Sequence, residues 1–160
     1  MATVDFLKKI EILQGLTDEQ LSELIVCWEE AAFQKGDKIF AEGEDASFMW
    51  VVTAGTVGLR FDLPGRPTSE ENAVSLNTEG MTIGWSSFVP PHKYHLSAYC
   101  DSESCGLIKL ERECLIKICE KDPAVGYVVM SNISKIIGKR FHQLQEEVIK
   151  RAGEEIMFHW

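Results

Sequence analysis

The sequence has no long uninterrupted apolar segment and no excess of positive charge. None of its apolar runs approaches the roughly 18 residues of a membrane-spanning helix, and its first residues lack the apolar core of a signal peptide. Sixteen Lys and Arg stand against 25 Asp and Glu, which gives a net charge of −9. Such a surface repels nucleic acid and anionic membranes. We therefore expect a cytoplasmic protein that binds neither.

Catalytic and metal-binding patterns are also scarce. The sequence has only four histidines, none of them in an H-x-H pair, and it has no P-loop and no Ser/His/Asp context. A metalloenzyme of the cupin type needs two or three histidines and a carboxylate that converge inside a barrel. We therefore expect no enzymatic activity, no catalytic residues and no metal site. A haem-binding or metal-binding jelly-roll protein stays open as a less favoured alternative.

The cysteines are odd in number and occur without a signal peptide, which indicates reduced thiols rather than a disulfide framework. They are Cys27, Cys100, Cys105, Cys114 and Cys119. Buried thiols pack as small apolar side chains. We expect core packing for these residues and keep a metal or redox role as the alternative.

Helical signals occupy residues 1–30. Thr17 and Gln20 have the spacing of a capping box, in which each side chain caps the other residue's backbone N–H. Apolar residues follow at helical spacing as far as Trp28, and Gly15 separates a shorter helix ahead of them. We predict helical structure from Val4 to Glu30.

The apolar period changes to two over residues 31–110. About seven or eight short strands follow one another with turns roughly every 8–12 residues, a pattern typical of an antiparallel sandwich, roll or barrel. Residues 48–52 and 56–61 flank an Ala54-Gly55 turn, and we predict that they pair as a hairpin. This part of the chain is predicted to form a β-roll.

Helical periodicity returns over residues 111–153. We predict a short hinge helix at 111–121, and Pro123 suits the first turn of a second, long helix. One apolar stripe follows this long helix: Val129, Ile133, Ile137, Phe141, Leu144 and Val148. A bare stripe would be adhesive, so we predict that a second copy covers it in a homodimer. Docking on the chain's own sheet is the alternative for its first half.

The last residues, 154–160, are apolar where a chain end is ordinarily polar. The apolar members are Ile156, Met157, Phe158 and Trp160. Two readings stay open for this tail: an unattached end, or a lid that folds over the pocket mouth or onto the dimer partner.

Four motifs, in one order and at characteristic distances, carry a resemblance to a known family. They are FLKKI and LTDEQL within residues 6–21, KGDKIFAEGEDA at 35–46, WVVTAGTV at 50–57 and GWSSFVPPHKYHLSA at 84–98. Along nearly its whole length the chain resembles the cyclic nucleotide-binding domain family, the sensor half of catabolite-activator-type bacterial regulators. The resemblance implies a mainly β fold with flanking helices, namely a double-stranded β-helix or jelly roll followed by a long C-terminal helix. It also implies a cAMP-binding-like signalling role, here without the DNA-binding domain of those regulators.

Residues 80–98, called the cassette below, match the family's phosphate-binding segment. In the family a Gly-Glu pair and a later arginine hold the ribose and the phosphate, and a small residue lies beside the arginine. Here Gly84 matches, but Trp85 replaces the glutamate. His92 or Lys93 falls at the arginine, and the bulky Tyr94 lies near the small residue. Tryptophan cannot accept a hydrogen bond from a hydroxyl, and lysine lacks the planar fork of arginine.

We predict a ligand site formed by Gly84, Trp85, Ser86, Ser87, His92, Lys93 and Tyr94. The ligand is predicted to be atypical, such as a small planar or hydrophobic acid held by Lys93 and by the amides of Ser86 and Ser87. Two alternatives stay open. The aromatic side chains plug the cavity and leave a structural dimerisation module, or a cyclic nucleotide binds in a shifted geometry. A sensor of this kind would pass its response through the two C-terminal helices to a downstream protein partner.

Overall fold

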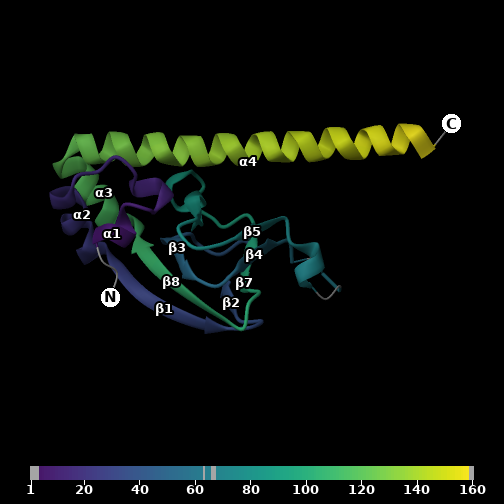
Figure 1. The fold of residues 1–160 in the computed structure, drawn as a ribbon, viewed down its shortest axis with the longest axis horizontal. Coiled ribbons are helices and arrows are strands. Elements are labelled where there is room, and N and C mark those ends of the chain that lie inside the picture. Colours follow the sequence, from purple (N-terminus) through teal and green to yellow (C-terminus); the bar gives the residue numbers. More distant parts are fainter. Residues whose placement is uncertain (1–3, 63, 66–67, 159–160) are drawn as a thin grey trace.

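The computed structural model describes residues 4–62, 64–65 and 68–158, with side chains as far as Glu154. Two four-stranded sheets form a roll, short helices gather at one end, and one long helix runs along the roll and projects past it (Figure 1). The strands are β1 (Trp28–Gln34), β2 (Lys38–Phe40), β3 (Phe48–Ala54), β4 (Val57–Arg60), β5 (Ser75–Asn77), β6 (Thr82–Ile83), β7 (Ser97–Cys100) and β8 (Ser104–Glu111). The helices are α1 (Val4–Leu7), α2 (Asp18–Leu24), α3 (Arg112–Lys121) and α4 (Pro123–Phe158), with 3-10 turns η1 (Glu11–Leu13), η2 (Ile25–Cys27), η3 (Glu70–Asn72) and η4 (Trp85–Phe88). The predicted jelly roll with flanking helices is confirmed.

The two sheets are antiparallel, with strand orders β1-β8-β3-β6 and β2-β7-β4-β5. The predicted hairpin of residues 48–52 with 56–61 is wrong, because β3 pairs with β6 and β8 whereas β4 pairs with β5 and β7. Gly55, at φ 80°, turns the chain out of one sheet and into the other, and a Cβ there would collide with the backbone oxygen of Ser104. A turn motif in the sequence predicts that the chain reverses its direction. It does not specify which strands pair with the two segments that the turn connects.

Alternate residues of β3 contribute to two hydrophobic cores, as the two-residue period of a strand requires. Met49 and Val51 pack with the N-terminal helices, α3 and the first half of α4. Trp50 and Val52 lie in the core inside the roll. The helices and the roll therefore fold as one unit that shares a central strand.

The N-terminal helices begin as predicted and end earlier. The hydroxyl of Thr17 accepts a hydrogen bond from the N–H of Gln20 at 3.3 Å, and the Gln20 side chain accepts one from the N–H of Thr17 at 3.1 Å, so the capping box is confirmed. The prediction of helix as far as Glu30 is wrong at its end. Residues 28–30 already belong to β1, where Trp28 pairs with Leu110 of β8. Pairing with a distant strand overrides the local helical spacing.

The two halves of α4 differ in burial. Val129 and Ile133 are buried in the helical core, and Ile137 is half-buried. Phe141, Leu144 and Val148 are 53–58% exposed, so the chain's own roll leaves the second half of the stripe largely uncovered.

The N-terminal half of α4 is also fixed by a buried side chain. The amide of Asn132 donates hydrogen bonds to the backbone oxygens of Ile12 and Gln14, at 3.1 Å and 2.8 Å. α4 continues past Gly153, the predicted end, to Phe158. The apolar tail side chains from Ile156 to Trp160 lie outside the described residues. Throughout the described ranges, each helix is too short or too polar to cross a membrane.

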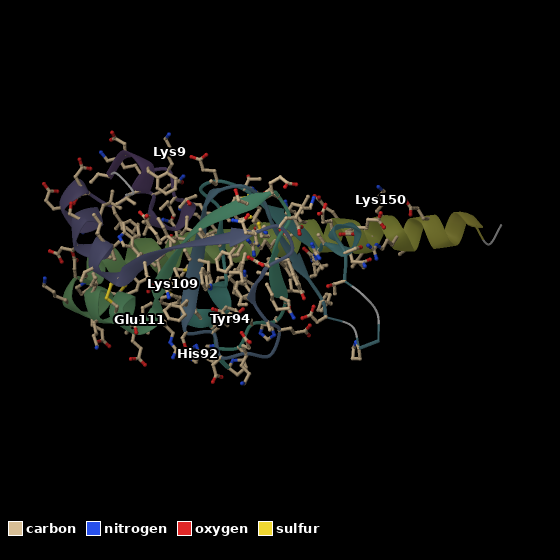
Figure 2. The ribbon with its side chains drawn as sticks, turned by 90° about the horizontal axis from the view of Figure 1, so that it is seen from below. Lys9, His92, Tyr94, Lys109, Glu111 and Lys150 are labelled. Carbon is tan, nitrogen blue, oxygen red and sulfur yellow. A yellow bond between two sulfur atoms is a disulfide. The ribbon has the colours of Figure 1, made fainter. Side chains whose placement is uncertain are left out.

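The prediction of reduced thiols is wrong for two of the cysteines. Cys27, at the end of η2, forms a disulfide with Cys114 in α3, and their Cα atoms lie 5.4 Å apart (Figure 2). Cys100, Cys105 and Cys119 are free. The pair is separated by 87 positions and meets only because the helices from the two ends of the chain pack together. That packing is a tertiary feature which cysteine counting does not detect.

Candidate functional site

A cavity of about 690 Å³ lies between the cassette side of the roll and α4. Its roll wall includes Phe40, Leu59, Asn77, Trp85 and Tyr94, and its helix wall includes Ile136, Ile137, Arg140 and Phe141. A volume of this size is typical of small-molecule sites. Because the walls come from two parts of the fold, an occupant that fills the cavity would contact both.

The backbone at the start of the cassette is fixed by a glycine. Gly84 has φ 74° and precedes the single 3-10 turn η4. A Cβ at this position would lie 3.1 Å from the ring of Tyr94 and 3.3 Å from that of Trp50. Both the positive φ and the close rings therefore require glycine here.

Four of the seven predicted site residues line the cavity: Gly84, Trp85, Ser86 and Tyr94. Ser87 is fully buried, its N–H donates to the oxygen of Gly84 at 3.0 Å, and its hydroxyl has no partner among the described residues. The amide of Ser87 is thus already engaged within the turn.

The two basic candidates lie away from the cavity wall. His92 has φ 59°, and its Nδ1 is 3.0 Å from the backbone oxygen of Ser87; Figure 2 shows it at the margin of the molecule. Lys93 donates to the carboxylate of Asp45 at 3.0 Å, and both side chains are at least half exposed. Neither residue lines the cavity.

Trp85 lines the cavity and does not fill it. Its ring is half-buried and packs against the helical core, and it forms part of the wall between the roll and α4. A bound aromatic group could therefore contact the indole of Trp85 at this wall.

Tyr94 occupies the interior of the roll behind the cassette. Its ring stacks on Phe40 with centroids 3.9 Å apart, its hydroxyl donates to the oxygen of Phe48 at 2.6 Å, and it accepts from Nε1 of Trp50 at 3.2 Å. Burial raises the pKa of this phenol, which therefore stays protonated at neutral pH. The side chain narrows the space inside the roll, so the cavity lies toward α4.

Sequence analysis did not identify two polar residues of the cavity, Asn77 and Arg140. Nη2 of Arg140 donates to Oδ1 of Asn77 at 2.9 Å and to the backbone oxygen of Thr82 at 2.8 Å. The available signal was the position of Arg140, three residues after Ile137 on the helix and therefore close to the apolar stripe.

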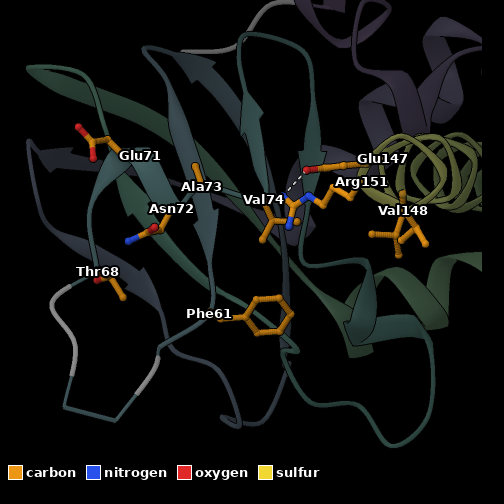
Figure 3. A pocket seen from close by; sticks show the side chains of 10 residues that line it. Phe61, Thr68, Glu71, Asn72, Ala73, Val74, Glu147, Val148 and Arg151 are labelled. Atoms are coloured by element: carbon orange, nitrogen blue, oxygen red, sulfur yellow. Dashed lines mark hydrogen bonds and ion pairs between the residues drawn. The ribbon is translucent and has the colours of Figure 1, made fainter. Parts of the chain in front are cut away.

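A second groove, also of about 690 Å³, lies between the β4–β5 connection and the far half of α4. Figure 3 shows Phe61 and Val74 on its roll side and Val148 and Arg151 on its helix side. Arg151 pairs with Glu147 one turn earlier on the helix. The apolar residues of this groove are about half exposed. It therefore continues the uncovered part of the α4 stripe.

Among the residues that the structure describes, no three His, Cys, Asp or Glu side chains come together as a metal site would require. The alternative of a bound metal ion therefore has no ligand cluster to support it in that part of the chain.

Several solved structures share this architecture. A protein of Geobacter metallireducens GS-15 that is named for cyclic nucleotide binding is 26% identical, with a TM-score of 0.74 over 89% of this chain and 100% of that chain. A cyclic nucleotide-binding domain from Methylobacillus flagellatus KT is 17% identical, with a TM-score of 0.77 over 92% of this chain and 81% of that chain. The catabolite activator protein of Thermus thermophilus is 20% identical, with a TM-score of 0.70 over 89% of this chain and 63% of that chain. This chain has the cyclic nucleotide-binding domain fold.

Shorter matches occur among curated proteins. The chain is 34% identical over 53 residues to human cGMP-dependent protein kinase 2, which is 33% of this chain and 7% of the kinase. It is 39% identical over 51 residues to the cAMP-dependent protein kinase regulatory subunit of Candida albicans, 32% of this chain and 11% of that protein. The match thus spans about a tenth or less of these relatives. No protein-family model matches the chain.

Proposed function

We propose that this chain is a non-enzymatic sensor module that binds a small ligand in the cavity between the cassette and α4. The observation that carries this proposal is the shared wall: Trp85 and Tyr94 from the cassette face the same space as Ile137 and Arg140 from α4. An occupant that contacts both walls changes the free energy of docking α4 on the roll. The response passes through α3 and α4 to a protein partner.

The ligand is a small anionic, planar molecule, and cyclic nucleotides are the first candidates because of the fold. Three departures favour an atypical member of this class. Trp85 cannot accept a hydrogen bond from a ribose hydroxyl. Lys93 is directed to Asp45 outside the cavity, and the ring of Tyr94 occupies part of the roll interior.

Titration of the purified chain tests this function. Probes are cAMP, cGMP, cyclic dinucleotides and a set of planar aromatic acids, followed by tryptophan fluorescence and melting temperature. We expect a saturable fluorescence change with at least one probe, lost in Trp85→Phe and retained in Trp28→Phe, since Trp28 is not part of the cavity wall. If no probe moves either signal at millimolar concentration, the sensor function is rejected and a structural dimerisation module is favoured.

We also propose that the chain is a homodimer through the second half of α4. Support comes from the exposed row of Phe141, Leu144 and Val148 and from the half-exposed groove beside it. A second copy would present the same apolar row and cover both, as symmetric dimers do. Such a partner lies close to the mouth of the ligand cavity, because Phe141 and Leu144 line that cavity too.

A further inference from the structure

The half-buried guanidinium of Arg140 lies in the wall of the ligand cavity. One of its nitrogens, Nη2, is held by the Asn77 side chain of β5 and by the backbone oxygen of Thr82 in β6. Asn77 is itself 1% exposed and is fixed by its own bonds to the Val57 oxygen and the Ser75 hydroxyl. The orientation of this guanidinium is therefore set by two strands of the roll.

The other donors of Arg140 are unused. Among the described residues, its Nε and Nη1 have no hydrogen-bond partner, and the guanidinium forms no ion pair. Burial lowers the pKa of Arg140, and the negative charge of Glu11 opposes that shift. The Glu11 carboxylate itself accepts a hydrogen bond from the N–H of Thr82 at 2.7 Å. Burial takes part of this charge out of water while no anion pairs with it, so an anionic ligand at the cavity wall would be favoured.

Other groups on this side of the molecule fit the same chemistry less well. Lys139 and His95 also line the cavity, but both are exposed, where water screens their charge. In the cassette, the buried hydroxyls of Thr82 and Ser87 also have no partner among the described residues, but neither residue lines the cavity.

We propose that Arg140 is the anion-binding residue of the cavity, holding the phosphate or carboxylate of a small planar ligand through a charge-assisted hydrogen bond from Nε or Nη1. Both hydrogens of Nη2 are engaged by Asn77 and Thr82 and keep α4 attached to β5 and β6, so the ligand takes one of the remaining donors. The cation that the cassette lacks is thereby supplied by the long helix. This inference rests on the proposed function and identifies the residue through which ligand binding acts on α4.

The test follows Arg140 itself in the full chain. Protein labelled with ¹⁵N-arginine is titrated with four anionic probes, namely cAMP, cGMP, phenyl phosphate and benzoate, and with adenosine as a neutral probe. The NMR signal of the Arg140 Nε–Hε group is followed during each titration. This signal is assigned by its loss in Arg140→Gln. Affinities are then compared for Arg140→Gln, Arg140→Lys and the matched variant Lys139→Gln, which removes an equal charge from the neighbouring position. Circular dichroism verifies that each variant is folded.

We expect the Arg140 signal to move saturably with at least one anionic probe and not with adenosine. Arg140→Gln should weaken that probe about ten- to hundred-fold, Arg140→Lys less, and Lys139→Gln less than about three-fold. If the probes bind while the signal stays still, or if Arg140→Gln binds as well as the natural chain, the role of Arg140 is rejected and the sensor function stands. If no probe binds at all, both are rejected. If Arg140→Gln does not fold, the loss of the signal in Arg140→Lys assigns it, and the titration of the wild-type chain then decides the matter.

Discussion

The ring of Tyr94 stacks on that of Phe40, with centroids 3.9 Å apart and planes inclined by 17°. Both rings lie in the core inside the roll, where Tyr94 of the cassette meets Phe40 of β2. The hydroxyl of Tyr94 is also held by β3, through the backbone oxygen of Phe48 and the indole N–H of Trp50. The bulky residue at this cassette position is thus part of the core and of the cavity wall at once.

Tyr94→Phe should lower the free energy of unfolding by about 1–3 kcal/mol, because the oxygen of Phe48 loses its donor and the indole N–H of Trp50 loses its acceptor. Urea unfolding measures this difference. The matched control is Tyr127→Phe, at a tyrosine that is 77% exposed, with an expected change within about 0.5 kcal/mol. Equal effects of the two substitutions would show that the buried hydroxyl contributes nothing.

Asp62 should make the stability of the fold sensitive to acid. Burial opposes its ionisation most strongly, yet hydrogen bonds from Ser97, Lys38 and Tyr99 together hold the pKa of this carboxyl below its ordinary value of 3.8. Because the pKa is lower in the folded chain, ionised Asp62 stabilises the fold above that value. This contribution is lost as the pH falls through 3.8 toward the lowered pKa.

The comparison of the natural chain with Asp62→Asn measures this contribution. The difference in unfolding free energy should be largest near neutral pH and shrink as the pH approaches 3. Asp45→Asn is the control, since its carboxylate is 84% exposed. A difference for Asp62→Asn that does not change with pH would contradict the prediction.

The disulfide between Cys27 and Cys114 should be detectable by counting thiols. Denatured protein is expected to show three reactive thiols before reduction and five afterwards. Replacing both cysteines by alanine should lower the unfolding free energy by about 2–4 kcal/mol, because the bond closes a long loop in the unfolded chain. Five thiols before reduction would exclude the bond, and Cys119→Ala is the control for loss of a single free thiol.

Placing glutamate at Phe141 and Leu144 should convert the proposed dimer to a monomer, because charge would enter the uncovered apolar row. Light scattering with size-exclusion chromatography measures the mass. Lys150→Glu is the matched control: nine residues separate it from Phe141, so it lies about half a turn around the helix. A monomeric natural chain, or a dimer that tolerates the double substitution, would reject the interface.

The features that sequence analysis predicted correctly are local ones. The capping box of Thr17 and Gln20 needs only neighbouring backbone atoms. Pro123 begins α4 because its fixed φ and missing N–H fit the first turn of a helix. The β-period and its turns were sufficient to predict a roll.

The features that it missed depend on residues far apart in the chain. Lys93 carries the charge expected of a cassette cation, but Asp45, 48 residues earlier, holds it outside the cavity. Arg140 contacts β5 and β6 from a helix that begins 40 residues after the end of β6. Charge and spacing in the sequence identify candidate ligand-binding residues. The packing of α4 on the roll decides which of these residues lie together at the cavity.

The uninterrupted course of α4 has a mechanical consequence. At about 1.5 Å per residue, the part from Ile136 to Phe158 is roughly 33 Å long. Its near end is fixed on the N-terminal helices by Asn132 and on the cassette by Arg140. A tilt of about 10° at that pivot would displace the tip by about 6 Å, since a helix transmits rotation along its axis as a stiff rod. The projecting half of α4 is therefore a lever arm, able to amplify a sub-ångström adjustment beside the cavity into a movement large enough for a partner protein to detect.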